Sequence, residues 1–369
     1  MKKIFITLFS IIILLQVSIT HIKSCTSFVL KTKDNSSVYG RTCEWGLFDT
    51  KSELVMVPRN FKFTSELGHG KNGMSWKTKY GFIGINGLKK PYYLDGMNEA
   101  GLTIGALYLP GFTKYQFVKS RKKSINNMDL LGYILGKFDT VKQIKEDLPK
   151  INVIYNEDII KITKAPMPLH YIVVDSNGDS IVIEYVNGKL KIHYNKIGIM
   201  TNSPTYDWHI LNLRNYTKLT PYAQGPGDKN INGINFTPFG GGSGMTGLPG
   251  DYSSSSRFIR AFFYTQTSIE LENIDMAVNQ ASRILNNFDY PKGFERNGAP
   301  DKYSLGYTQW NVIGDIKNKK YYWWTEHNRQ MRMVDLNKLN FDNNKIITSP
   351  LDKVRKQNIE DRTKDFLIS

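Results

Sequence analysis

Cys25 is the residue whose place in the chain offers the most specific chemistry. It follows a leader-like segment in the context KSCTSF at 23–28, so removal of residues 1–24 would leave a cysteine as the first residue. An N-terminal cysteine carries a thiol and a free α-amine on adjacent carbons, and the amine can accept the thiol proton. One residue would then supply both the nucleophile and the base of an acyl-transfer reaction.

The first 24 residues have the pattern of an export signal. Lys2 and Lys3 form a basic start, an apolar run extends over 4–19, and a short polar segment, 21–24, ends in a small residue. The apolar run is shorter than the roughly 20 residues that span a membrane, which favours cleavage over an uncleaved anchor. We therefore expect a periplasmic or secreted protein with no stable membrane insertion after signal removal.

The length and charge of the processed chain limit its organisation and its partners. Cleavage before Cys25 would leave 345 of the 369 residues, and we expect one domain over 25–369 with a polar C-terminal tail. Three lysines and no acid leave with the signal, so the net charge falls from +16 to +13. This charge suggests attraction to anions, although solubility alone would also explain it. A polyanion-binding protein is an alternative, but the basic residues are scattered and accompany no nucleic-acid motif, so no nucleic-acid partner is expected.

The two cysteines, Cys25 and Cys43, allow a disulfide in an exported protein. The surroundings of Cys25 instead favour a free nucleophile, which leaves Cys43 as a buried free thiol and not a catalytic partner. The six histidines show no metal-ligand spacing, so we expect no metal and no cofactor. The glycine-rich stretch 240–250 lacks the Gly-Lys-Ser/Thr ending of a phosphate loop and is predicted to be a mobile loop beside the site.

Strand and helix signals come in separate blocks along the chain. Residues 26–30 and 38–42 predict two strands with Cys25 at the mouth of the first, and Asn-Gly pairs at 177–178 and 187–188 predict an antiparallel meander over 171–200. Further strands are predicted at 54–57, 76–80, 102–107, 308–313 and 320–325, and helices at 128–138, 141–148, 204–216, 255–267 and 274–286. The blocks argue against a doubly wound parallel fold and for an α+β fold, with helices segregated to the faces of antiparallel sheets.

Five segments in a fixed order resemble the choloylglycine hydrolase and penicillin V acylase family of N-terminal nucleophile amidases. They are CTSF at 25–28, GRTCEW at 40–45, DGMNEAGL at 95–102, TNSPTYDW at 201–208 and SRF at 256–258. The resemblance covers roughly residues 25–324. It implies a four-layer αββα sandwich.

The resemblance also implies roles for five residues. Cys25 would be the nucleophile, and Arg41 would stabilise its thiolate. Glu44, where the family often has aspartate, would hold the α-amine, and the Asn202 side-chain amide would stabilise the oxyanion. Arg257 corresponds to a second arginine near the nucleophile at a helix start. Without the resemblance, these side chains would be ordinary surface charges, a turn carboxylate and a helix cap.

Tyr108 is the sixth position that the resemblance singles out. Its backbone N–H would be the second oxyanion donor, and its ring would line the acyl pocket, although alone it could equally be a core tyrosine. Penicillin V acylases tend to have tyrosine here and bile-salt hydrolases asparagine. The position therefore favours an aryl or fatty acyl group.

The resulting hypothesis is an exported amidase that hydrolyses linear, non-peptide C–N bonds through a thioester on Cys25. We expect a penicillin V acylase-like enzyme, with N-acyl homoserine lactones as further candidate substrates and conjugated bile acid hydrolysis as the alternative. The partner would be a small-molecule acyl amide, and the family implies a homotetramer. A non-enzyme alternative is a binding lipoprotein lipidated on Cys25, although Lys23 beside the cut fits a lipobox poorly.

Overall fold

The nucleophile candidate lies at the start of a hairpin that runs through the centre of the molecule. The computed structural model describes residues 24–163, 165–223, 229–236 and 242–367, so nearly all of the predicted signal lies outside the described residues. Strand β1 (Ser27–Lys31) pairs antiparallel with β2 (Ser37–Glu44), with Ser27 opposite Arg41. Every residue of β2 is buried, because β2 also pairs with a second strand on its other side.

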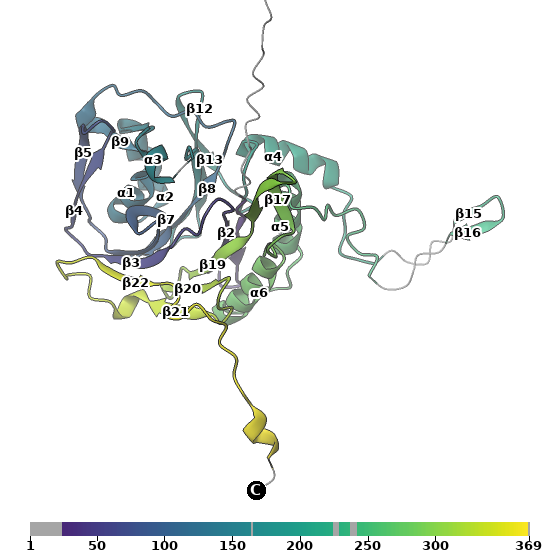
Figure 1. Ribbon diagram of the computed structural model, residues 1–369. Coiled ribbons are helices and arrows are strands. Elements are labelled where there is room, and N and C mark those ends of the chain that lie inside the picture. The colour runs from purple at the N-terminus through teal and green to yellow at the C-terminus, as the bar shows by residue number, and fades with distance from the viewer. Residues whose placement is uncertain (1–23, 164, 224–228, 237–241, 368–369) are drawn as a thin grey trace, which may run out of the picture.

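Two antiparallel sheets form the middle of the fold (Figure 1). The first sheet has the order β14 (Ile199–Met200), β1, β2, β19 (Thr308–Asp315), β20 (Lys320–Thr325) and β21 (Arg332–Asp335). The second has the order β13 (Lys189–Tyr194), β12 (Ser180–Val186), β11 (Leu169–Val174), β8 (Thr103–Tyr108), β7 (Lys90–Asn98), β6 (Phe82–Gly87), β3 (Glu53–Val57) and β22 (Ile347–Pro350).

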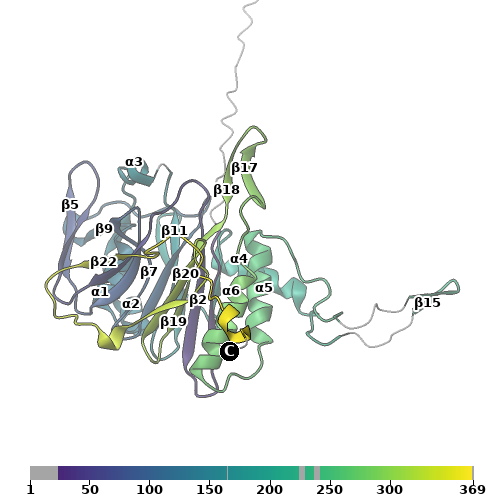
Figure 2. The same cartoon turned by 60° about the horizontal axis from the view of Figure 1, so that its bottom comes forward.

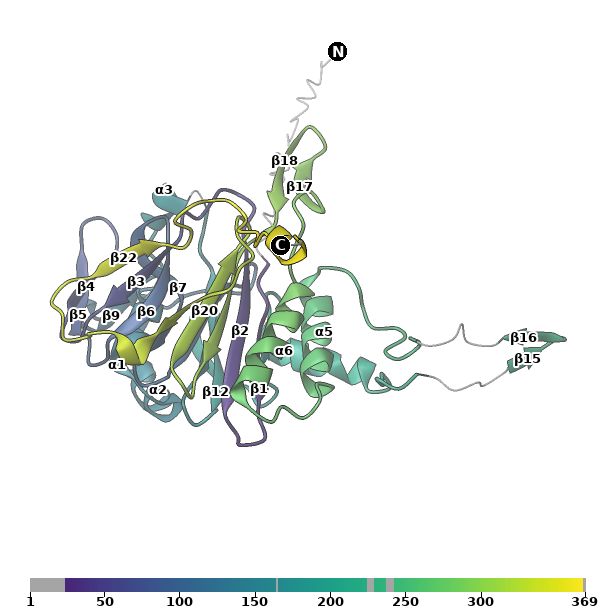
Figure 3. The ribbon, with the colours of Figure 1, turned by 90° about the horizontal axis from the view of Figure 1, so that it is seen from below.

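Helices cover the outer face of each sheet. Helices α5 (Ser254–Gln266) and α6 (Ile274–Asn286) pack on the first sheet, as Figure 3 shows along β1 and β2. Helices α1 (Leu130–Lys137) and α2 (Val141–Asp147) lie over the second sheet, where α1 contacts β7 and β8. These four layers confirm the predicted αββα sandwich.

The remaining elements are short. They are α3 (Ile159–Thr163), α4 (Tyr206–Asn212), and the two-stranded pairs β4 (Lys62–Glu66) with β5 (Asn72–Lys77), β9 (Ser124–Asn126) with β10 (Asn152–Ile154), β15 (Lys229–Ile231) with β16 (Ile234–Phe236) and β17 (Glu295–Ala299) with β18 (Lys302–Gly306). The β15–β16 and β17–β18 hairpins project from the body of the molecule in Figure 2. Among the described residues, no helix combines the length and the apolar character needed to cross a membrane.

Most predicted elements are present near their expected bounds. Thr140 caps α2 by accepting a hydrogen bond from the Gln143 backbone N–H, and both Asn-Gly pairs form hairpins within the second sheet. The meander prediction is wrong in its last strand, because β14 leaves the second sheet and pairs with β1 of the first. A short strand pairs with whichever sheet edge it reaches, and its sequence does not say which edge that is.

The predicted polar tail is also more structured than expected. Strands β21 and β22 close one edge of each sheet, so the irregular tail begins only after β22. Strand β22 is exposed along its length, which hides the apolar alternation that would have revealed it. Of the predicted loop at 240–250, residues 240 and 241 lie outside the described residues, and the rest forms turns.

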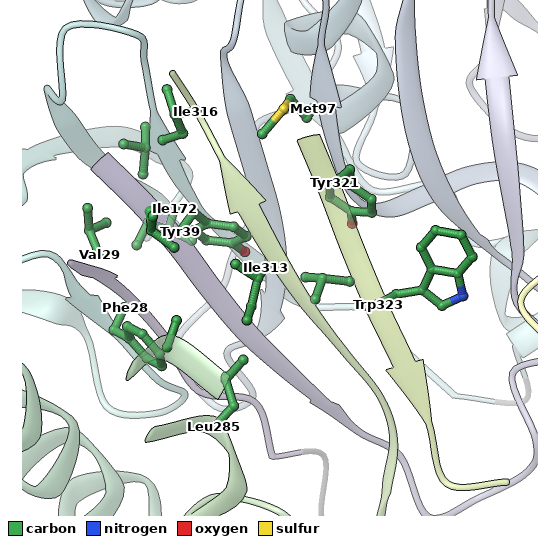
Figure 4. Packing of buried hydrophobic residues seen from close by; sticks show 14 of the residues in the cluster. Phe28, Val29, Tyr39, Met97, Ile172, Leu285, Ile313, Ile316, Tyr321 and Trp323 are labelled. Atoms are coloured by element: carbon green, nitrogen blue, oxygen red, sulfur yellow. The ribbon is translucent and has the colours of Figure 1, made fainter. Parts of the chain in front are cut away.

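The space between the sheets is filled by side chains from both. Figure 4 shows Tyr39 and Tyr321 of the first sheet in one cluster with Met97 and Ile172 of the second. Side chains alternate along a strand, so Tyr39, Arg41 and Cys43 all face this layer. The side chains of Tyr39, Arg41 and Cys43 therefore point from β2 into the layer between the sheets, where Cys25 also lies.

Candidate active site

Cys25 lies at one end of an apolar cavity between the sheets. The residue is only 5% exposed, and the cavity together with the open solvent beside it measures about 610 Å³. Its walls are mainly apolar and aromatic, from Cys25, Arg41, Cys43, Trp45, Phe48, Leu88, Tyr92, Leu94, Tyr108, Met128, Met167 and Leu169. A sulfur nucleophile thus faces a space lined for an apolar group.

Arg41 holds its charge beside the sulfur. Its Nη2 lies 3.7 Å from Cys25 Sγ and donates to the Ala106 carbonyl at 2.6 Å, while Nη1 donates to the Leu94 carbonyl at 2.7 Å. These carbonyls belong to the second sheet, so the guanidinium bridges the two sheets. Arg41 is 1% exposed, and its fixed cation favours the thiolate form of Cys25.

Asp95 is the partner that makes a buried Arg41 tolerable, and the sequence analysis gave it no role. Its Oδ2 lies 3.1 Å from Arg41 Nη1, and its oxygens accept hydrogen bonds from Tyr39 Oη at 2.8 Å and Tyr321 Oη at 2.6 Å. Gly105 leaves room for this cluster, since a Cβ there would lie 2.1 Å from Tyr39 Oη. Asp95 opens the quoted DGMNEAGL segment, but nothing in that segment names Arg41 as its partner.

Cys43 is the buried free thiol that the sequence predicted, and it also lies next to the nucleophile. Both cysteines are free and buried in the structure. A hydrogen bond from the Cys43 thiol, and then the Arg41 charge, lower the pKa of Cys25 to about 5 against the opposing effect of burial. At neutral pH the sulfur is therefore held mostly as the thiolate.

Asn202 binds the nitrogen side of Cys25. Its Oδ1 accepts hydrogen bonds from the Cys25 nitrogen and from Arg257 Nη2, both at 2.7 Å. Two donors facing one oxygen fix the orientation of the amide. Its Nδ2 donates one hydrogen to the Tyr108 carbonyl at 2.8 Å, which leaves the second hydrogen of the same nitrogen for an oxyanion.

Arg257 holds the main chain of the nucleophile. From the first turn of α5, its Nη1 donates to the Cys25 carbonyl at 2.5 Å and to Thr26 Oγ1 at 2.8 Å. Its Nε donates to the Tyr252 carbonyl at 3.0 Å. Within the described chain these hydrogen bonds go to carbonyl, hydroxyl and amide oxygens and not to a carboxylate.

Glu44 is buried close to the nucleophile but does not bind its nitrogen in this structure. Its Oε1 accepts from Thr308 Oγ1 at 2.9 Å, and its Oε2 has no hydrogen-bond partner among the described residues. Burial raises the pKa of Glu44 well above its usual range, and the nearby Cys25 charge adds to this shift. The nitrogen contact that the sequence analysis gave to Glu44 is made by Asn202.

Tyr108 ends β8 in the cavity wall. Its ring packs edge-on against Trp45, with centroids 6.2 Å apart, and its hydroxyl donates to the Pro166 carbonyl at 3.3 Å. Over the described ranges, no group of three or more His, Cys, Asp and Glu side chains is arranged to hold a metal ion.

The sequence matches a known family over this whole arrangement. Residues 25–349 match the linear amide C–N hydrolases of the choloylglycine hydrolase family. A bile salt hydrolase/transferase of Clostridium perfringens is 33% identical over 339 residues, covering 89% of this chain and 97% of that protein. A penicillin V acylase of Pectobacterium atrosepticum is 29% identical over 343 residues, covering 86% of this chain and 82% of that protein.

Solved structures show the same fold. A variant of the conjugated bile acid hydrolase from Clostridium perfringens superposes with a TM-score of 0.78 at 30% identity, covering 92% of this chain and 99% of that one. Penicillin V acylase from Agrobacterium tumefaciens gives 0.70 at 25% identity, covering 89% and 92%. The αββα sandwich is thus that of the N-terminal nucleophile hydrolases. The chain belongs to the choloylglycine hydrolase family and is a linear amide C–N hydrolase.

Proposed function

We propose that this enzyme hydrolyses the amide bond of conjugated bile acids, with Cys25 as its nucleophile. The observation that carries the proposal is the Cys25 sulfur, which lies 3.7 Å from Arg41 Nη2 and lines an apolar cavity. Relatives named as bile salt hydrolases favour this alternative over the penicillin V acylase activity expected from the sequence.

The reaction follows from the two sides of Cys25. The thiolate attacks the amide carbonyl carbon, and the second Nδ2 hydrogen of Asn202 stabilises the oxyanion that forms. The Tyr108 backbone N–H, the predicted second donor, stays a prediction. Collapse of the intermediate releases the amine product as the Cys25 α-amine, which holds the thiol proton, gives that proton to the leaving nitrogen. Water then hydrolyses the thioester on Cys25.

The proposal requires removal of residues 1–24. In the uncleaved chain the Cys25 nitrogen is a peptide N–H, which cannot accept a proton, whereas the α-amine released by cleavage can. Two observations support this maturation. The family match begins at Cys25, and Glu44 Oε2 is a buried acceptor with no hydrogen-bond donor among the described residues. We propose that the released amine stays on Asn202 Oδ1 and gains Glu44 as a second partner.

The cavity supports a large apolar acyl group. Leu88, Tyr92 and Met167 lie in its walls, and such surfaces favour a steroid-like body by burial. The net charge of +13 that remains after removal of residues 1–24 also suits a substrate whose glycine or taurine end is anionic.

A phenoxyacetyl amide such as penicillin V is the second candidate. Tyr108 supports it, because its ring presents an aromatic edge next to Trp45 in the cavity wall. The similarity to penicillin V acylases supports it too.

A substrate panel on mature protein tests the proposal. The N-terminus is first verified as Cys25 by intact mass, which also detects a lipid adduct and so excludes or establishes the lipoprotein alternative. Release of glycine, taurine, phenoxyacetate or homoserine lactone is then compared at equal enzyme concentration. We expect the highest kcat/KM for a bile acid conjugate, and a preference for penicillin V would reverse our order of candidates.

We also propose that the mature enzyme is exported and forms a homotetramer. The β15–β16 hairpin, which projects from the body of the molecule in Figure 1, supports assembly, since its Ile231, Ile234 and Phe236 side chains are exposed. Light scattering on the parent and on an Ile231→Asp/Ile234→Asp variant tests this, with a smaller species expected for the variant.

A further inference from the structure

The two cysteines of the chain lie directly opposite each other on neighbouring strands. The β1–β2 register pairs Ser27 with Arg41, and continuing it by two residues places Cys25 opposite Cys43. The ladder does continue, since Thr42 N donates to the Thr26 carbonyl at 2.9 Å and Glu44 N to the Ser24 carbonyl at 3.0 Å. Both cysteine side chains therefore project from the same face of the hairpin.

The type of this pair sets the distance between the two residues. The hydrogen bonds lie at the flanking pairs, so Cys25 and Cys43 form the pair without backbone hydrogen bonds. Such pairs have Cα atoms about 4.5 Å apart. Disulfides span Cα separations of roughly 4.4–6.8 Å, so these two cysteines can be joined without moving the strands.

The cavity gives small oxidants access to the nucleophile. Cys25 and Cys43 both line it, and Arg41 beside them favours the thiolate, which is the form that oxidants attack. A thiolate without a neighbouring thiol is oxidised onward to the irreversible sulfinic and sulfonic acids.

We propose that Cys25 and Cys43 form a reversible cross-strand disulfide when a hydroperoxide enters the cavity, and that this bond protects the nucleophile from irreversible oxidation. The Cys25 thiolate attacks the peroxide, so an S–O bond forms, the O–O bond breaks, and a sulfenic acid and hydroxide result. The Cys43 thiol gives its proton to hydroxide and attacks the sulfenic sulfur. The S–S bond forms as the S–O bond breaks, and the sulfenic oxygen leaves as hydroxide.

The electrostatics of the pair give the order of these steps. Cys43 is the less acidic thiol at rest: its hydrogen bond to Cys25, burial, and the negative charge of the Cys25 thiolate raise its pKa well above the usual range. Oxidation turns Cys25 into a neutral sulfenic acid and removes that negative charge. Cys43 can then lose its proton, with Arg41 close to both sulfurs.

The first test uses the mature wild-type protein and hydrogen peroxide, with the mass and the activity followed together. Because the chain has no other cysteine, a disulfide within it can only join these two residues, and peptide mapping separates this bond from oxygen added to methionines. We expect loss of two hydrogens, loss of both alkylatable thiols, a cross-linked peptide joining residues 25 and 43, and recovery of activity with dithiothreitol. Oxygen additions to Cys25 without loss of hydrogen would overturn the proposal. The mass result does not depend on which substrate the enzyme uses, so it can fail or succeed separately from the proposed function.

Two variants separate the disulfide from the hydrogen bond. Cys43→Ser keeps a donor towards Cys25 and Cys43→Ala removes it, but neither can form the disulfide. Each variant is compared with its own untreated activity. We expect peroxide to inactivate both irreversibly, with oxygen atoms added to Cys25, while wild type recovers. Recovery of Cys43→Ser to the same fraction as wild type would show that Cys43 does not protect the nucleophile.

Discussion

The two sides of Cys25 are built in different ways. On the sulfur side, Arg41 forms an ion pair with Asp95 at 3.1 Å, and the same guanidinium lies 3.7 Å from the Cys25 sulfur. On the nitrogen side, Arg257 has neutral oxygen partners and, with Asn202, holds the main chain and nitrogen of Cys25. Both arginines are 1% exposed. The sulfur side therefore tunes reactivity, and the nitrogen side fixes position.

Removal of the sulfur should have the largest effect. We expect Cys25→Ala to lower kcat by about 10⁴-fold or more, because it removes the sulfur that attacks the substrate. Circular dichroism and thermal unfolding should match those of the parent. Activity within about tenfold of the parent in a correctly folded variant would place the nucleophile elsewhere.

Loss of the Asn202 amide should remove both the oxyanion donor and the acceptor that holds the Cys25 nitrogen. We expect Asn202→Ala to lower kcat by roughly 10²–10³-fold, the usual cost of an oxyanion donor. Asn202→Asp is the matched control, since it keeps an acceptor for the Cys25 nitrogen and Arg257 but removes the N–H donor. Parent-like kcat in Asn202→Asp would show that the amide only positions the nucleophile.

Removal of the carboxylate charge should test whether the sulfur side is held by an ion pair. We expect Asp95→Asn to reduce the free energy of unfolding by about 3–5 kcal/mol, because it leaves the Arg41 charge buried without its partner. Tyr321→Phe removes one hydrogen bond to the same carboxylate and should cost only about 1–2 kcal/mol. Urea unfolding measures the free energy of unfolding of both variants. Equal reductions would show that the ion pair stabilises the fold no more than the single hydrogen bond does.

The smallest effect concerns pH. Because the Cys25 pKa is lowered to about 5, the thiolate is present above that pH, and kcat/KM should fall as the pH drops through it. Cys43→Ala removes the largest cause of the lowered pKa, so the acid limb of kcat/KM should move to higher pH. Cys43→Ser should move it less. An unchanged limb in Cys43→Ala would assign the low pKa to Arg41 alone.

The same comparison shows what the sequence could predict. The β1–β2 hairpin is local, so strand signals on either side of a turn place Arg41 near Cys25. Asn202 and Arg257 are far along the chain and were found only through family resemblance. The α+β class followed from the helix and strand blocks, since burial patterns within each element are local, whereas the four αββα layers were predicted through the family resemblance.

The rest depends on pairings between distant segments. Asp95 meets Arg41 only because β7 faces β2 across the layer between the sheets, and no signal in either strand specifies that meeting. Cys43 was judged by its residue type, although the hairpin register already placed it opposite Cys25. The edge strands β14, β21 and β22 pair with the strands that the rest of the fold brings next to them. Their sequences are too short or too exposed to predict this pairing.

Trapping of the acyl-enzyme tests the central claim most directly. Mature protein is mixed with a conjugated bile acid, quenched in acid within the first turnover, and measured by intact mass and peptide mapping. We predict one added acyl group, lost on treatment with hydroxylamine, on a peptide that begins with Cys25. An acyl group on any other residue, or turnover by a chain whose Cys25 nitrogen is still blocked, would contradict the account.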